Sequence, residues 1–159
     1  MKTPEYLYLD FLQECAVYME YDDPCTAEEV DELERSLGIK FPRAYRELVM
    51  IFGKYSSFTI AENSFEYPEY QGMRDAAIEM AAGDDMVKID ENIFVFNFDF
   101  HGPSAAWFPL NAGDDPPVYE YASVNEKTGF KVAEHFSAYI RMLPWYQGFL
   151  SIKERRAKK

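Results

Sequence analysis

Hydrophobic side chains recur at helical spacing in the first third of the chain, beginning with a stripe near the N-terminus. The members of this stripe are Tyr8, Leu12, Cys15 and Met19. Residues 3–5, Thr-Pro-Glu, precede it, and these residue types suit a helix cap, a first turn and the positive end of the helix dipole. We therefore predict an N-terminal helix over residues 4–19, interrupted before Pro24.

A second helix is predicted between Thr26 and Gly38. Thr26 and Glu29 have the spacing of a capping box, in which each side chain binds the backbone amide of the other residue. Gly38 can adopt the left-handed conformation that ends many helices. One face of this helix is hydrophobic, at Val30, Leu33 and Leu37. The other face carries four acids, which we interpret as solvated: Glu28, Asp31, Glu32 and Glu34.

Two more helices are predicted, one after Pro42 and one between Gly72 and Gly83. Pro42 can open a third helix, which ends at Gly53. Its inward side chains are Tyr45, Leu48, Val49 and Phe52. After a strand near residues 57–61, a helical period returns between Gly72 and Gly83. The face of this fourth helix is made of small or flexible residues, namely Met73, Ala76, Ala77, Met80 and Ala81.

The second half of the chain has the period of β-strands. Alternation over residues 93–100 places four phenylalanines on one face, at positions 94, 96, 98 and 100. The other face begins apolar and turns polar, which predicts an interior strand that is covered on one side and half covered on the other. Further strands are predicted over residues 105–110, 118–122 and 130–132, separated by turns rich in Asn, Gly and Asp.

A final helix closes the predicted fold, and Pro144 ends or bends it. Its apolar positions are Val132, Phe136, Tyr139, Ile140 and Leu143. Helices thus come first, strands follow, and one helix closes the chain. This segregation predicts an α+β fold with a mostly antiparallel sheet. With 159 residues we expect a single domain over 1–159, in which Leu37 and Phe136 are buried.

The net charge of −12 narrows the classes of partner. A negative field repels phosphate backbones and speeds encounter with basic molecules, so we expect no nucleic acid as a partner. Residues 153–159 have the opposite sign, with five bases and one acid, whereas residues 1–152 carry −16. We interpret this basic C-terminal tail as a solvated end, with a contact arm as the alternative.

The cysteines and the N-terminus predict a cytoplasmic protein. Cys15 and Cys25 are too few for a disulfide framework and lack the spacing of metal ligands. Residues 1–6 lack the apolar segment of a signal peptide. No stretch approaches about 18 consecutive apolar residues, so we expect no membrane contact.

The residues that usually carry catalysis are scattered, so we predict no catalytic, cofactor-binding or metal-binding residue. His101 precedes Gly-Pro and suits a turn, while His135 stands near the start of the final helix. Three acidic pairs, at positions 22–23, 84–85 and 114–115, lie beside Pro or Gly, where Asp side chains stabilise turns. A magnesium site assembled from distant carboxylates is the alternative.

Two blocks of sequence resemble the SUKH superfamily, which includes bacterial toxin-immunity proteins and fungal regulators of cell-wall synthesis. In the first block, from Val30 onward, the matching residues are Leu37, Gly38, Ile39, Phe41, Pro42, Tyr45, Leu48 and Gly53. The second comprises residues 98–102, Trp107-Phe108 and residues 113–121, and it is followed by Phe136, Tyr139 and Ile140. The resemblance covers about residues 26–143, and the N-terminal helix and the basic tail lie outside it. These residues also have a complete structural explanation, so we do not assign them to a site.

The resemblance implies a protein that acts by binding another protein. It identifies the chain as similar to immunity proteins, or antitoxins, whose partner is a cognate toxin and in many cases a nuclease. A regulatory or scaffolding module of the cell-wall type is the alternative, and a hydrolytic enzyme is a third. For a basic nuclease we predict partner contacts at four acids that project into solvent, Asp84, Asp85, Asp114 and Asp115. We expect a monomer or a weak homo-oligomer, with the twelve tyrosines divided between core and interface.

Overall fold

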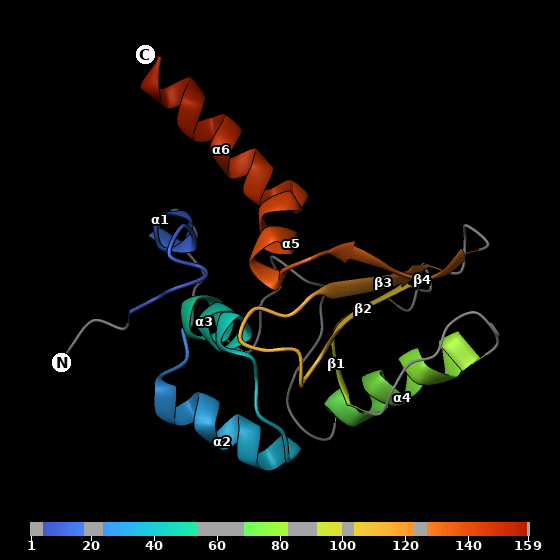
Figure 1. Ribbon diagram of the computed structural model, residues 1–159. Coiled ribbons are helices and arrows are strands. Elements are labelled where there is room, and N and C mark those ends of the chain that lie inside the picture. Colours follow the sequence, from blue (N-terminus) through green and yellow to red (C-terminus); the bar gives the residue numbers. More distant parts are fainter. Residues whose placement is uncertain are drawn as a thin grey trace.

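Helices and strands are segregated along the chain, which confirms the α+β class. The computed structural model describes residues 5–17, 24–53, 69–82, 92–99, 104–122 and 127–158 (Figure 1). The elements are α1 (Leu12–Val17), α2 (Ala27–Leu37), α3 (Arg43–Phe52), α4 (Glu69–Ala82), β1 (Ile93–Asp99), β2 (Ser104–Pro109), β3 (Val118–Ala122), β4 (Lys127–Ala133), α5 (Phe136–Met142) and α6 (Pro144–Ala157). The strand predicted near residues 57–61 lies outside the described residues.

The N-terminal helix is shorter than predicted. Residues 7–11 form bends and a turn, and the α-helix begins only at Leu12. The cause lies on α3, where the carboxylate of Glu47 accepts the backbone N–H groups of residues 7–9, each at 2.9 Å. Because a side chain satisfies these amides, they do not enter helical hydrogen bonds. Residues 4, 18 and 19 of the predicted helix lie outside the described residues.

The boundaries of α2 and α3 agree with the predicted caps. Glu29 N–H donates to Thr26 Oγ1 at 3.2 Å, and Thr26 N–H donates to Glu29 Oε2 at 2.8 Å, which completes the capping box. Gly38 ends α2 in the left-handed conformation, with φ of 67°. Pro42 precedes α3 and Gly53 follows it. These local signals hold because each acts within one turn of a helix end.

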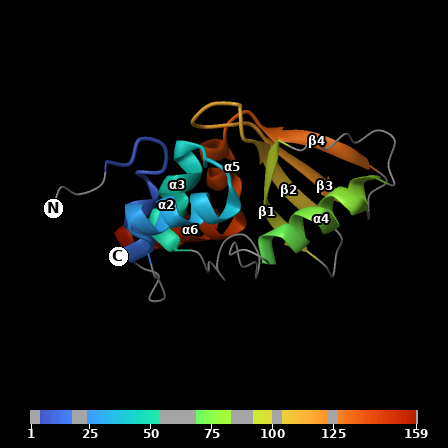
Figure 2. The same cartoon turned by 90° about the horizontal axis from the view of Figure 1, so that it is seen from below.

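The described strands form one antiparallel sheet in the order β1-β2-β3-β4. Among the described strands, β1 is the first in this order. The small-residue helix α4 packs against β1 (Figure 2), and its Ala77 is fully buried. This helix begins three residues before Gly72, where the sequence placed its start.

A bulge in β1 overturns the expectation that its phenylalanines share one face. The register shifts between Val95 and Asn97, so that Phe94 is opposite Phe108 but Phe98 is opposite Ala105. An extra residue reverses which side chains face the core. Phe98 therefore lies on the face opposite to Phe94, and it is buried there. Phe100 lies outside the described residues.

The core is an aromatic cluster centred on Tyr45 of α3. Its ring centroid is 4.9 Å from those of Phe41 and Phe94, 5.3 Å from Phe108 and 5.7 Å from Phe136. These side chains come from α3, the segment before it, two strands and α5, so the cluster joins helices to sheet. Phe136 is fully buried, as predicted.

The C-terminal part contains a helix that the sequence did not predict. The closing helix α5 ends at Met142, and Leu143 takes an extended conformation. Pro144 then opens α6 as its first residue, where its missing N–H costs nothing. Residues 153–157 of the basic tail are helical, and residues 151–158 are all exposed. Figure 1 shows the second half of α6 projecting from the rest of the molecule.

Replacing Phe136 by Ala should lower the free energy of unfolding by about 3–5 kcal/mol, because it empties a site among the rings of Tyr45, Phe96 and Phe108. Phe130 is 54% exposed, and its replacement by Ala is the matched control, with an expected change of about 0.5 kcal/mol or less. Urea denaturation measures both. Equal losses in the two variants would place Phe136 outside the core.

Candidate protein-binding surface

Glu34 is buried, although the sequence placed it on the solvated face of α2. It is 1% exposed, and its Oε1 accepts the backbone N–H of Phe41 at 3.0 Å. Lys40 Nζ lies 2.6 Å from Oε2, and Arg46 Nη1 lies 2.8 Å from Oε1. One carboxylate therefore joins the end of α2, the crossing segment before Pro42 and the first half of α3.

The charged form of Glu34 is the stable one. Burial alone raises the pKa of this carboxyl, but hydrogen bonds from Lys40, Arg46 and the Phe41 amide together hold its pKa below the ordinary value. Burial likewise disfavours the charged guanidinium of Arg46. Its hydrogen bonds to Glu34 and Asp31 outweigh that effect and raise its pKa. At neutral pH the site thus holds an ion pair between Glu34 and Arg46.

Glu47 is the second buried acid, at 4% exposure. Besides the three amides of residues 7–9, it accepts a hydrogen bond from Arg43 Nε at 3.3 Å. Arg43 in turn donates from Nη2 to the backbone carbonyl of Glu5 at 3.2 Å. These contacts attach the N-terminal segment to α3.

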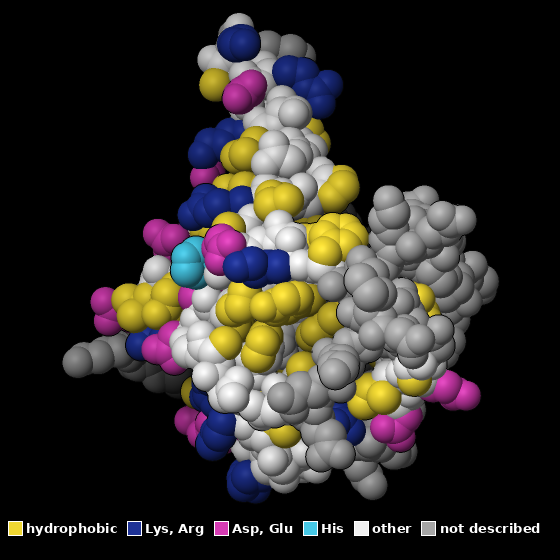
Figure 3. Space-filling model, turned by 45° about the vertical axis from the view of Figure 1, so that its right-hand side comes forward, with side chains coloured by type: hydrophobic (Ala, Val, Ile, Leu, Met, Phe, Trp, Pro, Cys, Tyr) yellow, Lys and Arg dark blue, Asp and Glu magenta, His cyan; other side chains and the backbone are white. Residues whose placement is uncertain are grey.

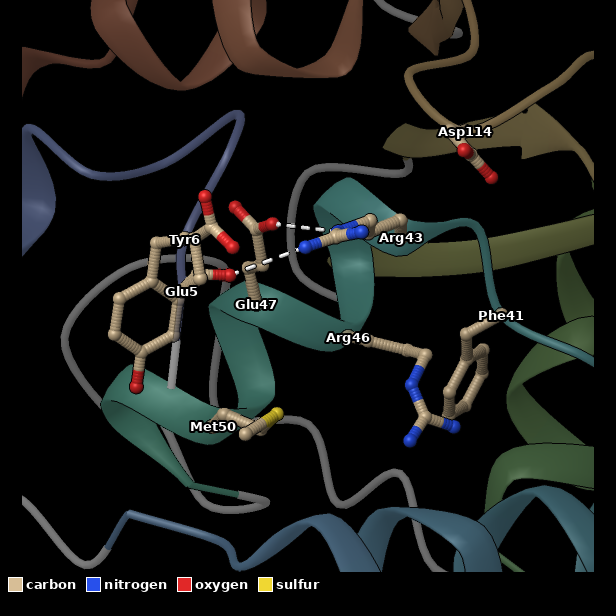
Figure 4. A pocket seen from close by; sticks show the side chains of 8 residues that line it. All are labelled: Glu5, Tyr6, Phe41, Arg43, Arg46, Glu47, Met50 and Asp114. Carbon is tan, nitrogen blue, oxygen red and sulfur yellow. Dashed lines mark hydrogen bonds and ion pairs between the residues drawn. The ribbon is translucent and has the colours of Figure 1, made fainter. Parts of the chain in front are cut away.

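A cleft of about 370 Å³ lies between that segment and α3 (Figure 4). Its lining residues are Glu5, Tyr6, Phe41, Arg43, Arg46, Glu47, Met50 and Asp114. Both of its arginines are bound by acids, Arg43 by Glu47 and Arg46 by Glu34 and Asp31. By contrast, Glu5 and Asp114 are exposed. The unbalanced charge at this cleft is therefore negative.

The predicted acid pair at residues 114–115 is divided between two roles. Asp114 is exposed, as predicted, and its backbone carbonyl accepts the N–H of Ala44 at the start of α3, at 2.8 Å. Asp115 does not project into solvent. Its carboxylate accepts the Ser137 N–H at 2.8 Å and the Ser137 hydroxyl at 2.6 Å, and so it caps α5 from another part of the chain. Asp84 and Asp85 lie outside the described residues.

The remaining acids of α2 extend the negative surface. Glu28, Asp31 and Glu32 are exposed, as predicted for this face. Asp31 accepts a hydrogen bond from Arg46 Nη2 at 2.9 Å, which connects the face to the cleft. The acidic face of α2, the cleft and Asp114 form what we call the α2–α3 surface.

In the described part of the chain, no group of three or more His, Cys, Asp or Glu side chains is placed to hold a metal ion. His135 is exposed, with Nδ1 at 3.2 Å from the carbonyl of Asp115, and His101 lies outside the described residues. None of the helices in the described segments is long and apolar enough to cross a membrane.

Replacing Glu34 by Gln should lower the free energy of unfolding at neutral pH by about 1.5–3 kcal/mol, the usual contribution of hydrogen bonds to a charged group. The pKa of Glu34 is lowered in the folded state. Wild type therefore keeps this contribution above pH 4.5, the ordinary pKa of a Glu carboxyl, and loses it as the pH falls through the folded-state pKa. Between neutral and acidic pH, the free energy of unfolding should therefore fall less in the variant than in wild type. Urea denaturation from neutral to acidic pH tests this, with Glu32→Gln on the same helix as the control. Parallel pH profiles for all three proteins would contradict it.

Replacing Asp115 by Ala should cost about 0.5–2 kcal/mol of stability, because the start of α5 loses its cap. Asp114→Ala keeps the backbone carbonyl and should change stability by about 0.5 kcal/mol or less. Thermal melting compares the two variants. An Asp115 variant as stable as the Asp114 variant would show that the cap is energetically unimportant.

Comparison with known proteins places this architecture in a family. The sequence profile of the SMI1 / KNR4 family (SUKH-1) matches residues 24–142, from the segment before α2 to the end of α5. The comparison with individual curated proteins gave no match. The matched region contains all four described strands, the aromatic core and the α2–α3 surface except Glu5 and Tyr6 of the cleft, whereas α1 and α6 lie outside it. Since the match spans most of its length, the chain belongs to the SMI1 / KNR4 family (SUKH-1).

Proposed function

We propose that this protein is an immunity protein that binds a cognate toxin and neutralises it, and that the toxin is a basic nuclease. Family membership supports a protein-binding role, and one observation supports the sign of the partner. At the α2–α3 surface the arginines are held by internal acids, while Glu28, Glu32 and Asp114 remain exposed. Such a surface can occupy a basic cleft that otherwise binds phosphates.

The arrangement of the arginines matters for this proposal. Arg46 uses Nη1 and Nη2 for Glu34 and Asp31, so its charge is already compensated within the protein. A basic partner therefore meets carboxylates without a strong opposing field from Arg46. The cleft also offers the half-buried side chains of Tyr6 and Met50 as apolar contact area. Aromatic and methionine side chains are enriched at the cores of interfaces.

The proposal is tested by co-expression with a toxin domain encoded beside the gene. Co-purification of the two proteins, loss of nuclease activity in the complex and rescue of growth are the expected results. A folded protein that gives no protection would overturn the immunity role. If that protein also bound a cellular regulator, it would favour the regulatory or scaffolding role. Turnover of a substrate by the purified protein would favour the enzyme.

Reversing charge at the α2–α3 surface should slow association with the toxin. In the triple variant Glu28→Lys, Glu32→Lys and Asp114→Lys, we expect the association rate at low salt to fall by about tenfold or more. The difference should shrink at high salt, because ions screen exposed charges. Rates are measured by surface plasmon resonance, after circular dichroism has confirmed folding.

The matched control is Glu79→Lys, which reverses an exposed acid on α4. If the control associated slowly with the toxin and the triple variant associated at the wild-type rate, the contact surface would lie on α4 instead. A separate variant, Asp84→Lys with Asp85→Lys, tests the other predicted pair in the same assay. Asp115 is kept as Asp in every variant because it caps α5.

A further inference from the structure

The hydrophobic stripe of α6 continues past the body of the domain. At its start, the ring of Trp145 packs against Phe52, with centroids 5.8 Å apart, and that of Tyr146 packs against Phe11 at 5.0 Å. One turn further on, Phe149 is only half-buried, and Ile152 is 46% exposed. Helical spacing places Trp145, Phe149 and Ile152 on one side of α6. That side is therefore covered at its beginning and uncovered toward its end.

Exposed hydrophobic residues occur in α6, in the N-terminal segment and at the end of α5. Among the described residues, four large hydrophobic side chains are exposed, and three belong to the N-terminal segment, the end of α5 or α6. These three are Leu7 at 53%, Met142 at 60% and Ile152 at 46%. Figure 3 shows hydrophobic side chains beside Lys and Arg along the projecting helix. An apolar surface rimmed by charge is typical of a protein–protein contact.

The charges of this region are of both signs. The end of α6 carries Lys153, Arg155, Arg156 and Lys158, whereas α1 and the turn before it carry the exposed acids Asp10 and Glu14. Lys153 Nζ lies 2.5 Å from Glu14 Oε2, so α1 lies beside α6 at that level. Arg155, Arg156 and Lys158 lie beyond this bridge, on the projecting end of the helix.

We propose that this surface binds a second copy of the chain, through antiparallel packing of α6 against α6. Antiparallel packing brings the two exposed apolar stripes together. It also sets the basic end of each α6 near Asp10 and Glu14 of the other copy. Parallel packing would instead bring the two basic ends together. Contacts made twice by the same residues give a closed, two-fold dimer.

A second copy fits better than an unrelated partner because this chain itself supplies the complementary charge. Residues 1–152 carry −16, and the basic end of α6 is the part with opposite sign. The elements involved, α1 and α6, lie outside the family match at residues 24–142. The dimer does not depend on the proposed toxin binding, which uses the α2–α3 surface.

The test is sedimentation equilibrium of the full chain from micromolar to millimolar concentration. Wild type should approach twice the monomer mass, and Ile152→Asp should weaken dimerisation by about tenfold or more, because an apolar contact is lost. The double variant Arg155→Glu with Arg156→Glu should also weaken it, and its residual association should depend less on salt than that of wild type. Phe130→Asp is the matched control, since this exposed hydrophobic side chain lies on β4, and the variant should dimerise like wild type.

Several results would overturn the proposal. Wild type that stays monomeric throughout the concentration range would exclude the dimer. Species larger than a dimer would exclude the closed antiparallel arrangement. An Ile152→Asp variant that dimerises normally would remove α6 from the contact, and loss of association in Phe130→Asp alone would move the contact to β4. Circular dichroism of each variant separates these outcomes from unfolding.

Discussion

The buried carboxylate of Glu34 fixes how the first helices meet the sheet. It binds the Phe41 amide, and Phe41 then lies within the aromatic cluster around Tyr45. It also binds Arg46, one turn along α3 from Pro42, so the direction in which α3 leaves the crossing segment is held by an ion pair. A buried charge is costly unless it is paired and hydrogen-bonded, and here each carboxylate oxygen has a partner. These contacts join α2, the crossing segment and α3 through one side chain.

Glu47 also connects two segments, namely the N-terminal segment and α3. Its carboxylate accepts three consecutive backbone amides and thereby holds the N-terminal segment on α3 without any helix in that segment. The attachment positions α1, and Phe11 can then pack against Tyr146 and lie under Arg141. The elements outside the family match are tied to the matched region through the Glu47 carboxylate, the burial of Leu9 and Leu12 in the core and the contact of Trp145 with Phe52.

Much of the fold could be predicted because its signals are local. The capping box at Thr26, the left-handed Gly38 and the proline before α3 each act within a few residues. Glu34 was predicted to be solvated because it is charged. Its position indicated the opposite, since residues 30, 33, 34 and 37 form one helical stripe. The bulge in β1 and the cap supplied by Asp115 depend on residues far apart in sequence, and so does the binding of residues 7–9 to Glu47. Neither composition nor spacing carries that information.

The same acids explain why net charge alone is a poor guide to a binding surface in this protein. Glu34, Glu47 and Asp115 contribute to the charge of −12, yet their carboxylates are satisfied inside the fold. The field that a partner meets comes from exposed side chains such as Glu28, Glu32 and Asp114. Since Arg43 and Arg46 are compensated by the internal acids, the buried carboxylates also determine the sign of the surface above them. In this way the contacts that build α3 set the electrostatic character of the surface through which we propose it acts.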